Sequence, residues 1–189
     1  MKKLIAVFGP GKVLADDTLY HESERLGALL ASAGFAVVTG GYDGVMEAAS
    51  KGAREAGGQA IGVTAEVYFA RGREANPYLT REVRVKSATD RLMELLDLPD
   101  AYCAIGNSTG TLAEIAMAWD YITKGFFPAK PILLIGKSWK GFFECVSTEE
   151  KFTPFLHLIQ FKESPELVMK ALLQAFGPQQ QLPELEIIK

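Results

Sequence analysis

The feature that most constrains this chain is a series of short apolar runs, each separated from the next by a segment with helical periodicity. Most of the runs are continuous rather than alternating, which is typical of strands covered on both faces. We expect strands over residues 3–8, 35–39, 59–64, 81–85, 101–105, 131–135 and 157–161. The helical patterns cover residues 17–33, 44–57, 87–97, 111–124, 139–149 and 164–176. This alternation predicts an α/β fold, a three-layer sandwich with one mainly parallel sheet of about seven strands.

Length and composition limit the class of protein. The 189 residues are 48% hydrophobic, which suits one domain with a full core. We expect this domain over residues 1–176 and a C-terminal tail over 177–189. With 23% charged residues and a net charge of −3, the chain has no bulk positive charge for binding nucleic acid. An acidic ligand must therefore be held by a local site.

Cysteine, histidine and the N-terminus argue against a metal, a cofactor and a membrane. Cys103 and Cys145 sit among apolar neighbours, which predicts two buried thiols, and there is no C-x-x-C pair. His21 and His157 have no ligand spacing. The N-terminal apolar run of about five residues is too short for a signal segment or a membrane span. We therefore expect no metal, no cofactor, no membrane partner and a cytoplasmic location.

Three familiar loop motifs fail. The first loop, after Gly9, has Leu14 where a dinucleotide fingerprint requires its third glycine. The segment that begins at Gly136 resembles the end of a Walker loop, but Pro131 stands where the first glycine would be. The stretch Gly106–Gly110 has the spelling of a serine-hydrolase elbow. Neither histidine is suitably placed for that chemistry.

Two glycine-rich junctions between a strand and a helix remain, over residues 38–47 and 104–116. At a helix start the first N–H groups lack partners and the helix dipole is positive, so small residues there let an anion approach. In a parallel sheet both junctions lie at carboxyl ends of strands and can line one crevice. The candidate binding residues are Gly40, Gly41, Asp43, Gly44, Glu47, Asn107, Ser108, Thr109, Gly110 and Thr111.

Each junction also has a purely structural interpretation. Thr111 and Glu114 have the spacing of a capping box, with Thr111 as N-cap and Glu114 at N3. Asp43 can likewise cap a helix that starts at Gly44. Two such junctions in one sheet favour binding more strongly than either junction does alone.

The two junctions together resemble the signatures of the LOG (LONELY GUY) family, whose members are often labelled lysine decarboxylase-like. The segments are GGYDGVMEAASKGAREAGG from residue 40 and GNSTGTLAE from residue 106, and the resemblance covers roughly residues 4–136. It implies a Rossmann-like nucleotide-binding fold and a homodimer, with higher assembly left open. The implied activity is a phosphoribohydrolase that cleaves the N-glycosidic bond of a nucleoside 5′-monophosphate. AMP and cytokinin riboside monophosphates are the expected substrate type, and base and ribose 5-phosphate the products.

The resemblance also indicates catalytic residues. Glu114 matches the glutamate of the family signature P-G-G-x-G-T-x-x-E, and Arg91 matches its arginine on the preceding helix. Breaking a ribosyl C–N bond develops positive charge on the sugar, so a carboxylate near the anomeric carbon is required. We expect Glu114 to stabilise that charge or orient water, Arg91 to pair with Glu114 or contact phosphate or base, and Glu47 to bind ribose hydroxyls. In the structural interpretation, Arg91 and Glu47 are solvated helix charges.

One departure from the signature keeps a second function open. Gly106, Asn107 and Ser108 replace Pro-Gly-Gly. The segments Gly44–Ala48 and GAREAGG are closer to a subgroup that includes molybdenum-cofactor carrier proteins, which bind a phosphorylated cofactor and need not hydrolyse it. The alternative is therefore a non-catalytic protein that binds or carries a nucleotide or the molybdenum cofactor.

Two further segments bear on ligand and partner. Residues 66–80 contain Arg71 and Arg73, which suits a mobile lid over an anionic ligand as well as an ordinary exposed loop. The helix over 111–122, TLAEIAMAWDYI, is apolar around most of its circumference. A surface helix normally shows a polar face, so this pattern favours packing against a second copy of the chain.

Overall fold

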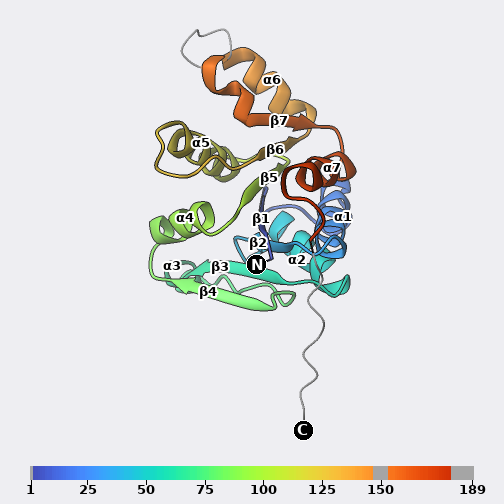
Figure 1. Ribbon diagram of the computed structural model, residues 1–189. Helices are drawn as coiled ribbons and strands as arrows, with labels where there is room; N and C mark the ends of the chain where they lie inside the picture. Colours follow the sequence, from blue (N-terminus) through green and yellow to red (C-terminus); the bar gives the residue numbers. More distant parts are fainter. Residues whose placement is uncertain (1, 147–152, 180–189) are drawn as a thin grey trace.

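The computed structural model describes residues 2–146 and 153–179 and has one seven-stranded sheet (Figure 1). The strands are β1 (Leu4–Phe8), β2 (Ala36–Thr39), β3 (Ala60–Ala65), β4 (Arg81–Val85), β5 (Ala101–Ile105), β6 (Ile132–Ile135) and β7 (Ile159–Lys162). All neighbouring strands are parallel, in the order β4-β3-β2-β1-β5-β6-β7. The expected Rossmann-like α/β fold is confirmed.

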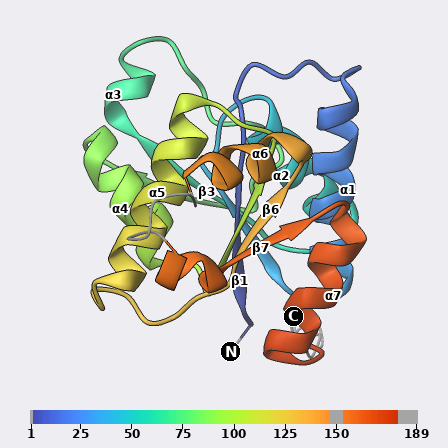
Figure 2. The same ribbon diagram turned by 90° about the horizontal axis from the view of Figure 1, so that it is seen from above.

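Helices cover both faces of the sheet. Figures 1 and 2 show α1 (Thr18–Ser32), α2 (Val45–Glu55) and α7 (Pro165–Phe176) on one side. The other side carries α4 (Ala88–Asp97), α5 (Thr109–Thr123) and α6 (Lys137–Val146). Two short elements, α3 (Glu66–Phe69) and η1 (Thr153–Leu158), complete the described chain.

Each face of the sheet has its own hydrophobic core, which explains the continuous apolar runs. Successive strand residues point to opposite faces. In β1, Ile5 and Val7 pack with α1, α2 and α7, whereas Ala6 and Phe8 pack with α4, α5 and α6. A strand buried in this way has no polar face to show in the sequence.

The expected boundaries differ from the structure in a few places. The strand expected over 157–161 begins at Ile159, because the two residues before it end η1. The expected helix over 139–149 extends into residues 147–149, which lie outside the described residues, as do residues 180–189 of the expected tail. Cys103 is buried but Cys145 is exposed, so that prediction is wrong for Cys145. Helix α6 buries Trp139 and Phe143, four residues apart, and Cys145 lies off that face.

The order of the strands reverses beside β1. The chain adds β2, β3 and β4 on one side of β1, then returns to place β5 on its other side. In open parallel sheets the connections leave a crevice at such a switch point, at the carboxyl ends of the strands. The loops after β1 and β5 therefore flank the expected ligand crevice.

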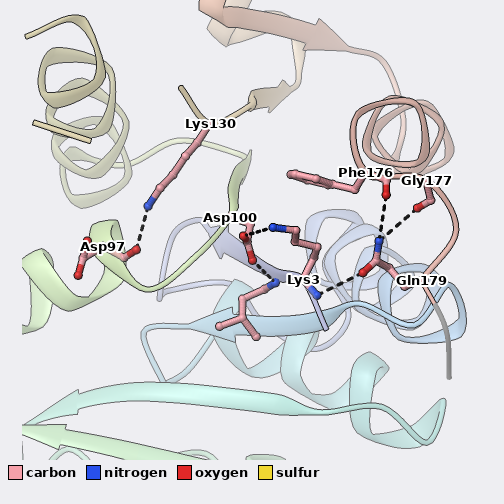
Figure 3. Close-up of polar contacts among 8 residues, drawn as sticks. Lys3, Asp97, Asp100, Lys130, Phe176, Gly177 and Gln179 are labelled. Carbon is pink, nitrogen blue, oxygen red and sulfur yellow. Dashed lines mark hydrogen bonds and ion pairs between the residues drawn. The ribbon is translucent and has the colours of Figure 1, made fainter. Parts of the chain in front are cut away.

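At the opposite, amino edge of the sheet, Lys3, Asp100, Lys130 and Gln179 form polar contacts with their neighbours (Figure 3). Asp100 accepts hydrogen bonds from Lys3 Nζ at 2.7 Å and from the Leu4 backbone N–H at 2.9 Å. Gln179, beyond α7, accepts from the Lys3 backbone N–H at 3.3 Å. Lys130 Nζ donates to the carbonyl of Asp97 at 2.8 Å. These side chains are thus engaged in contacts within the protein, whereas the two glycine-rich junctions lie at the carboxyl edge.

Candidate functional site

A cleft of about 570 Å³ lies at the carboxyl ends of the strands. The loops after β1, β2, β3 and β5 all contribute to its lining, together with α4 and α5. The first glycine-rich junction supplies Tyr42 and Met46, and the second supplies Ser108–Thr111 and Glu114. Segments far apart in the sequence therefore meet at one site.

The second junction forms the first turn of α5, which begins at Thr109 with Ser108 as N-cap. Ser108 Oγ accepts a hydrogen bond from the Thr111 backbone N–H at 3.2 Å and lies 2.9 Å from Thr111 Oγ1. The expected capping box of Thr111 with Glu114 is wrong, because the cap lies three residues earlier. Ser108 has the extended backbone of an N-cap, with φ −152° and ψ 171°, whereas Thr111 is already helical.

This cap leaves two N–H groups at the start of α5 available to a ligand. Within the part of the chain that the structure describes, no group accepts a hydrogen bond from the backbone N–H of Thr109 or Gly110. A Cβ built on Gly110 meets only Ser108 Oγ, at 3.8 Å, so the approach to these donors is open. The positive end of the α5 dipole lies at the same place.

Glu114 lies one turn further along α5 and lines the cleft. Its side chain is half-buried, and among residues 2–146 and 153–179 none forms a hydrogen bond or ion pair with its carboxylate. Burial raises the pKa of Glu114 to about 7, although the nearby charge of Arg91 acts in the opposite direction. At neutral pH both protonation states are therefore populated.

Arg91 is fixed from α4 onto two loops. Its Nε donates to the Val63 carbonyl at 2.8 Å and its Nη2 donates to the Gly40 carbonyl at 2.9 Å. Its guanidinium carbon lies 5.3 Å from the ring centroid of Tyr42. Burial lowers the pKa of Arg91, and the charge of Glu114 raises it. Arg91 is thus a held, part-buried cation of the cleft rather than a solvated helix charge.

The glycines of the first junction act through the backbone. Gly41 and Gly44 have φ of 77° and 67°, a region that favours glycine. A Cβ on Gly40 would lie 1.7 Å from Arg91 Nη2. Gly40, Gly41 and Gly44 are not among the described residues that line the cleft. They shape the turn and make room for Arg91.

Asp43 and Glu47 are likewise absent from the described residues that line the cleft. Asp43 is exposed, and the N-cap of α2 is Gly44, so the alternative in which Asp43 caps this helix is wrong. Glu47 Oε1 accepts a hydrogen bond from the Tyr20 hydroxyl at 3.0 Å. This contact ties α2 to α1 and does not support contact with a ribose.

Asn107 lies in a smaller pocket of about 280 Å³ beside the cleft. This pocket also contains Leu112, Trp139 and Phe142, and Ser108 and Thr109 line both spaces. Asn107 is therefore separated from the main cleft by the first turn of α5.

The segment 66–80 is anchored at one end and cationic at the other. Asn76 is buried, with its backbone N–H donating to the Gly41 carbonyl at 2.9 Å and its Nδ2 to the Tyr42 carbonyl at 3.1 Å. The other end forms α3 and carries Arg71 and Arg73, which line the cleft. The first junction thus positions two arginines over the site.

The lining of the cleft is strongly basic. The described residues of this lining include four cations, Lys12, Arg71, Arg73 and Arg91, but one carboxylate, that of Glu114. The chain as a whole has a net charge of −3, so this positive charge is local. Such an arrangement attracts anionic ligands.

Sequence reasoning missed Lys12, Tyr42 and Tyr68 as lining residues. The rings of Tyr42 and Tyr68 are 5.5 Å apart and meet edge to face. Tyr42 stands inside the first glycine-rich junction, which is a usable signal. Tyr68 had no local signal, because its place depends on how the segment after β3 folds back.

Neither a metal centre nor a membrane span is found in the described residues. Residues 2–146 and 153–179 contain no group of three or more His, Cys, Asp or Glu side chains that could hold a metal ion. No helix in these ranges is both long and apolar enough to cross a membrane.

Known proteins resemble this chain along most of its length. An uncharacterized protein of Archaeoglobus fulgidus is 30% identical over 115 residues, which are 60% of this chain and 72% of that protein. The molybdenum cofactor binding protein of Rippkaea orientalis has a TM-score of 0.74 and 26% identity, covering 93% of this chain and 98% of that one. The molybdenum cofactor carrier protein MCP of Chlamydomonas reinhardtii has a TM-score of 0.71 and 26% identity, covering 92% and 98%.

A family model covers the whole site. The model of the SLOG cluster4 family matches residues 2–152, which include both junctions and every lining residue of the cleft. This match confirms the resemblance to LOG-related proteins. The likeness to the two molybdenum-cofactor proteins confirms the resemblance to the subgroup that includes such carrier proteins. The chain belongs to the SLOG cluster4 family.

Proposed function

We propose that the cleft binds a nucleoside 5′-monophosphate and cleaves its N-glycosidic bond, giving free base and ribose 5-phosphate. The observation that carries this proposal is the half-buried Glu114 carboxylate among four cations. For binding an anion alone, a carboxylate in the cleft is unfavourable, because it repels the ligand. For glycosidic cleavage it is required, since positive charge develops on the sugar.

The phosphate would bind at the first turn of α5. The N–H groups of Thr109 and Gly110 have no acceptor among the described residues, and the helix dipole favours an anion there. The hydroxyl of Thr109 adds a further donor in the lining. In this arrangement the ribose lies beside Glu114, one helical turn along α5.

Glu114 would act on the attacking water. The water oxygen forms a bond to the anomeric carbon, the C–N bond breaks, and its electron pair leaves with the base. Glu114 takes the proton released by the water, and this proton can then pass to the departing base. A pKa of about 7 suits both steps, because the carboxyl group accepts and donates a proton at neutral pH.

Arg91 would position rather than react. Its two hydrogen bonds to the carbonyls of Val63 and Gly40 fix it in the wall of the cleft. Its positive charge opposes the rise in the pKa of Glu114 and so keeps part of that carboxylate ionised. The turn that contains Gly40, Gly41 and Gly44 supports Arg91 and does not contact the ligand in this proposal.

A second candidate is a protein that binds or carries a phosphorylated cofactor without cleaving it. The likeness to two molybdenum-cofactor proteins over more than nine-tenths of the chain supports it. A phosphorylated pterin would use the same α5 terminus and the same cations, and the molybdenum would travel as cargo. Glu114 has no evident task in this case.

Base release from nucleotides tests the choice. The protein is incubated with AMP and other nucleoside 5′-monophosphates, and free base is measured by chromatography. We expect release by the native chain, loss of release in Glu114→Gln with AMP affinity retained, and normal release in Glu22→Gln. Glu22 is an exposed glutamate of α1 and serves as the matched control. Intact binding without release from any nucleotide would support the carrier and reject the hydrolase.

We also propose that two copies of the chain associate through α5. A groove of about 530 Å³ between α5 and α6 is lined by Leu112, Ile115, Trp119, Phe142 and Phe143. Leu112 and Phe142 are exposed, which is unusual for large apolar side chains that lie together. Sedimentation of the native chain and of Leu112→Glu measures whether two copies associate. A native monomer at micromolar concentration would reject it.

A further inference from the structure

The cleft has two separate positive features. One is the first turn of α5, which follows β5, and the other is the pair Arg71 and Arg73, which follows β3. In the sheet, β2 and β1 lie between β3 and β5. Three strand spacings correspond to roughly 14 Å between the two strand ends. One phosphate at the start of α5 is therefore too small to reach the end of β3 as well.

Arg73 is held close to another cation. Its guanidinium carbon lies 5.6 Å from the ring centroid of Tyr42, and that of Arg91 lies 5.3 Å from the same ring. Burial lowers the pKa of Arg91, and the charge of Arg73 lowers it further. Two guanidinium groups near one ring repel each other, and an anion between or beside them would offset this repulsion.

Arg71 and Arg73 also differ from a neighbouring arginine in their ion pairs with the described residues. Arg84, on the neighbouring strand β4, pairs with Glu82 at 3.0 Å. Within residues 2–146 and 153–179, no carboxylate lies within 4.0 Å of the side-chain nitrogens of Lys12, Arg71 or Arg73. Among the described residues, these three cations therefore form no ion pair.

We propose that the ligand carries a second anionic group, apart from the phosphate at α5, and that Arg71 and Arg73 bind it. This inference rests on the proposed function only in that the cleft binds a phosphorylated ligand. It adds the substrate class: small phosphorylated compounds with a second phosphate or a comparable anion. The aromatic walls of Tyr42 and Tyr68 keep Arg73 directed over the cleft.

Calorimetric titration with AMP and with adenosine 3′,5′-bisphosphate tests this inference. For the native chain we expect the bisphosphate to bind at least about tenfold more tightly than AMP. In the double variant Arg71→Gln/Arg73→Gln the ratio falls to below about threefold, while AMP affinity changes by less than about threefold. Both arginines are exposed, and each single variant repeats the test if the double variant loses its fold.

A matched control removes two positive charges elsewhere. Arg81 lies at the amino end of β4 and Lys170 lies on α7, and both are exposed. In Arg81→Gln/Lys170→Gln the ratio stays at the native value if the arginines of the cleft form a local site. A ratio that falls equally in both double variants would reduce the effect to net charge and overturn the inference.

The remaining outcomes separate this inference from the proposed function. Equal native affinities for the two compounds would overturn the second anion site, and base release from AMP would still support the hydrolase. Equal weakening of AMP and bisphosphate in Arg71→Gln/Arg73→Gln would also overturn it, because these arginines would then hold the single phosphate. A tenfold preference without base release would support the second anion site and reject the hydrolase.

Discussion

Replacing Gly110 by alanine separates binding from stability at the first turn of α5. A Cβ at this position meets only Ser108 Oγ, at 3.8 Å, so the folded protein accommodates the methyl group. Gly110 is a helical residue of α5, and alanine there adds up to about 0.5–1 kcal/mol of stability. The same methyl group lies in the lining of the cleft, where it hinders the approach of an anion to the backbone.

The expected loss of affinity follows from one hydrogen bond. A hydrogen bond to a charged group contributes about 1.5–3 kcal/mol. If the methyl group keeps the phosphate from one of the N–H groups of Thr109 and Gly110, AMP affinity falls by roughly 30-fold. The thermal midpoint stays the same or rises, so misfolding cannot explain the loss.

Calorimetric titration with AMP and a thermal melt measure the two quantities in the same preparation. Gly141→Ala is the control, because Gly141 lies in α6 and a Cβ there meets nothing within 4 Å. It should gain similar helix stability without any change in AMP affinity. If Gly110→Ala binds AMP as tightly as the native chain, no anion approaches the start of α5, and the basis of the proposed site is refuted.

Three further variants test the same site. Glu114→Gln should be more stable than the native chain at pH 8 by up to roughly 3 kcal/mol. The pKa of Glu114 is about 7 in the folded state and 4.5 ordinarily, so the native chain loses stability as the pH rises between these values. Urea unfolding at pH 4.5 and pH 8 measures this, and a pH-independent difference would contradict it. Gly40→Ala should lower the free energy of unfolding by about 2–4 kcal/mol, because its Cβ would lie 1.7 Å from Arg91 Nη2 and displace that side chain. A loss below about 1 kcal/mol in urea unfolding would argue against a fixed Arg91. Ser108→Gly should lower the free energy of unfolding by only about a few tenths of a kcal/mol. Because it releases the Thr111 N–H, it should raise AMP affinity about threefold in the same titration. Weaker binding would mean that the Ser108 hydroxyl contacts the ligand.

The strands were predictable from sequence because both faces of the sheet are covered. A run such as that of β5 (Ala101–Ile105) is buried at every residue, so it has no polar positions to blur the pattern. The start of α5 was not predictable to the residue. Ser108 and Thr111 are both good N-caps, and only the extended backbone of Ser108 in the folded chain decides between them.

Some parts of the candidate site were likewise predictable from the sequence and others were not. The glycine-rich junctions are local in sequence and could be found there. The partners of Arg91 could not, because its guanidinium contacts carbonyls that are 28 and 51 residues away along the chain. Glu47 shows the converse case: its position in the first turn of α2 suited a ligand contact, but Tyr20, from α1, takes its carboxylate. Side-chain direction at such positions depends on tertiary packing.

The replacement of Pro-Gly-Gly by Gly106, Asn107 and Ser108 has a structural consequence that links the two proposals. With Ser108 as N-cap, its hydroxyl occupies the Thr111 N–H, and two backbone donors at Thr109 and Gly110 remain for an anion. A glycine at position 108 would leave that third N–H open to the ligand. A cleft with fewer backbone donors must draw more of its affinity for an anion from side chains. In our proposal, Arg71 and Arg73 of the segment 66–80 supply that charge and bind a second anionic group of the ligand. On this proposal, Ser108 in place of glycine and the two arginines of the cleft act on the same ligand, one at each of its anionic groups.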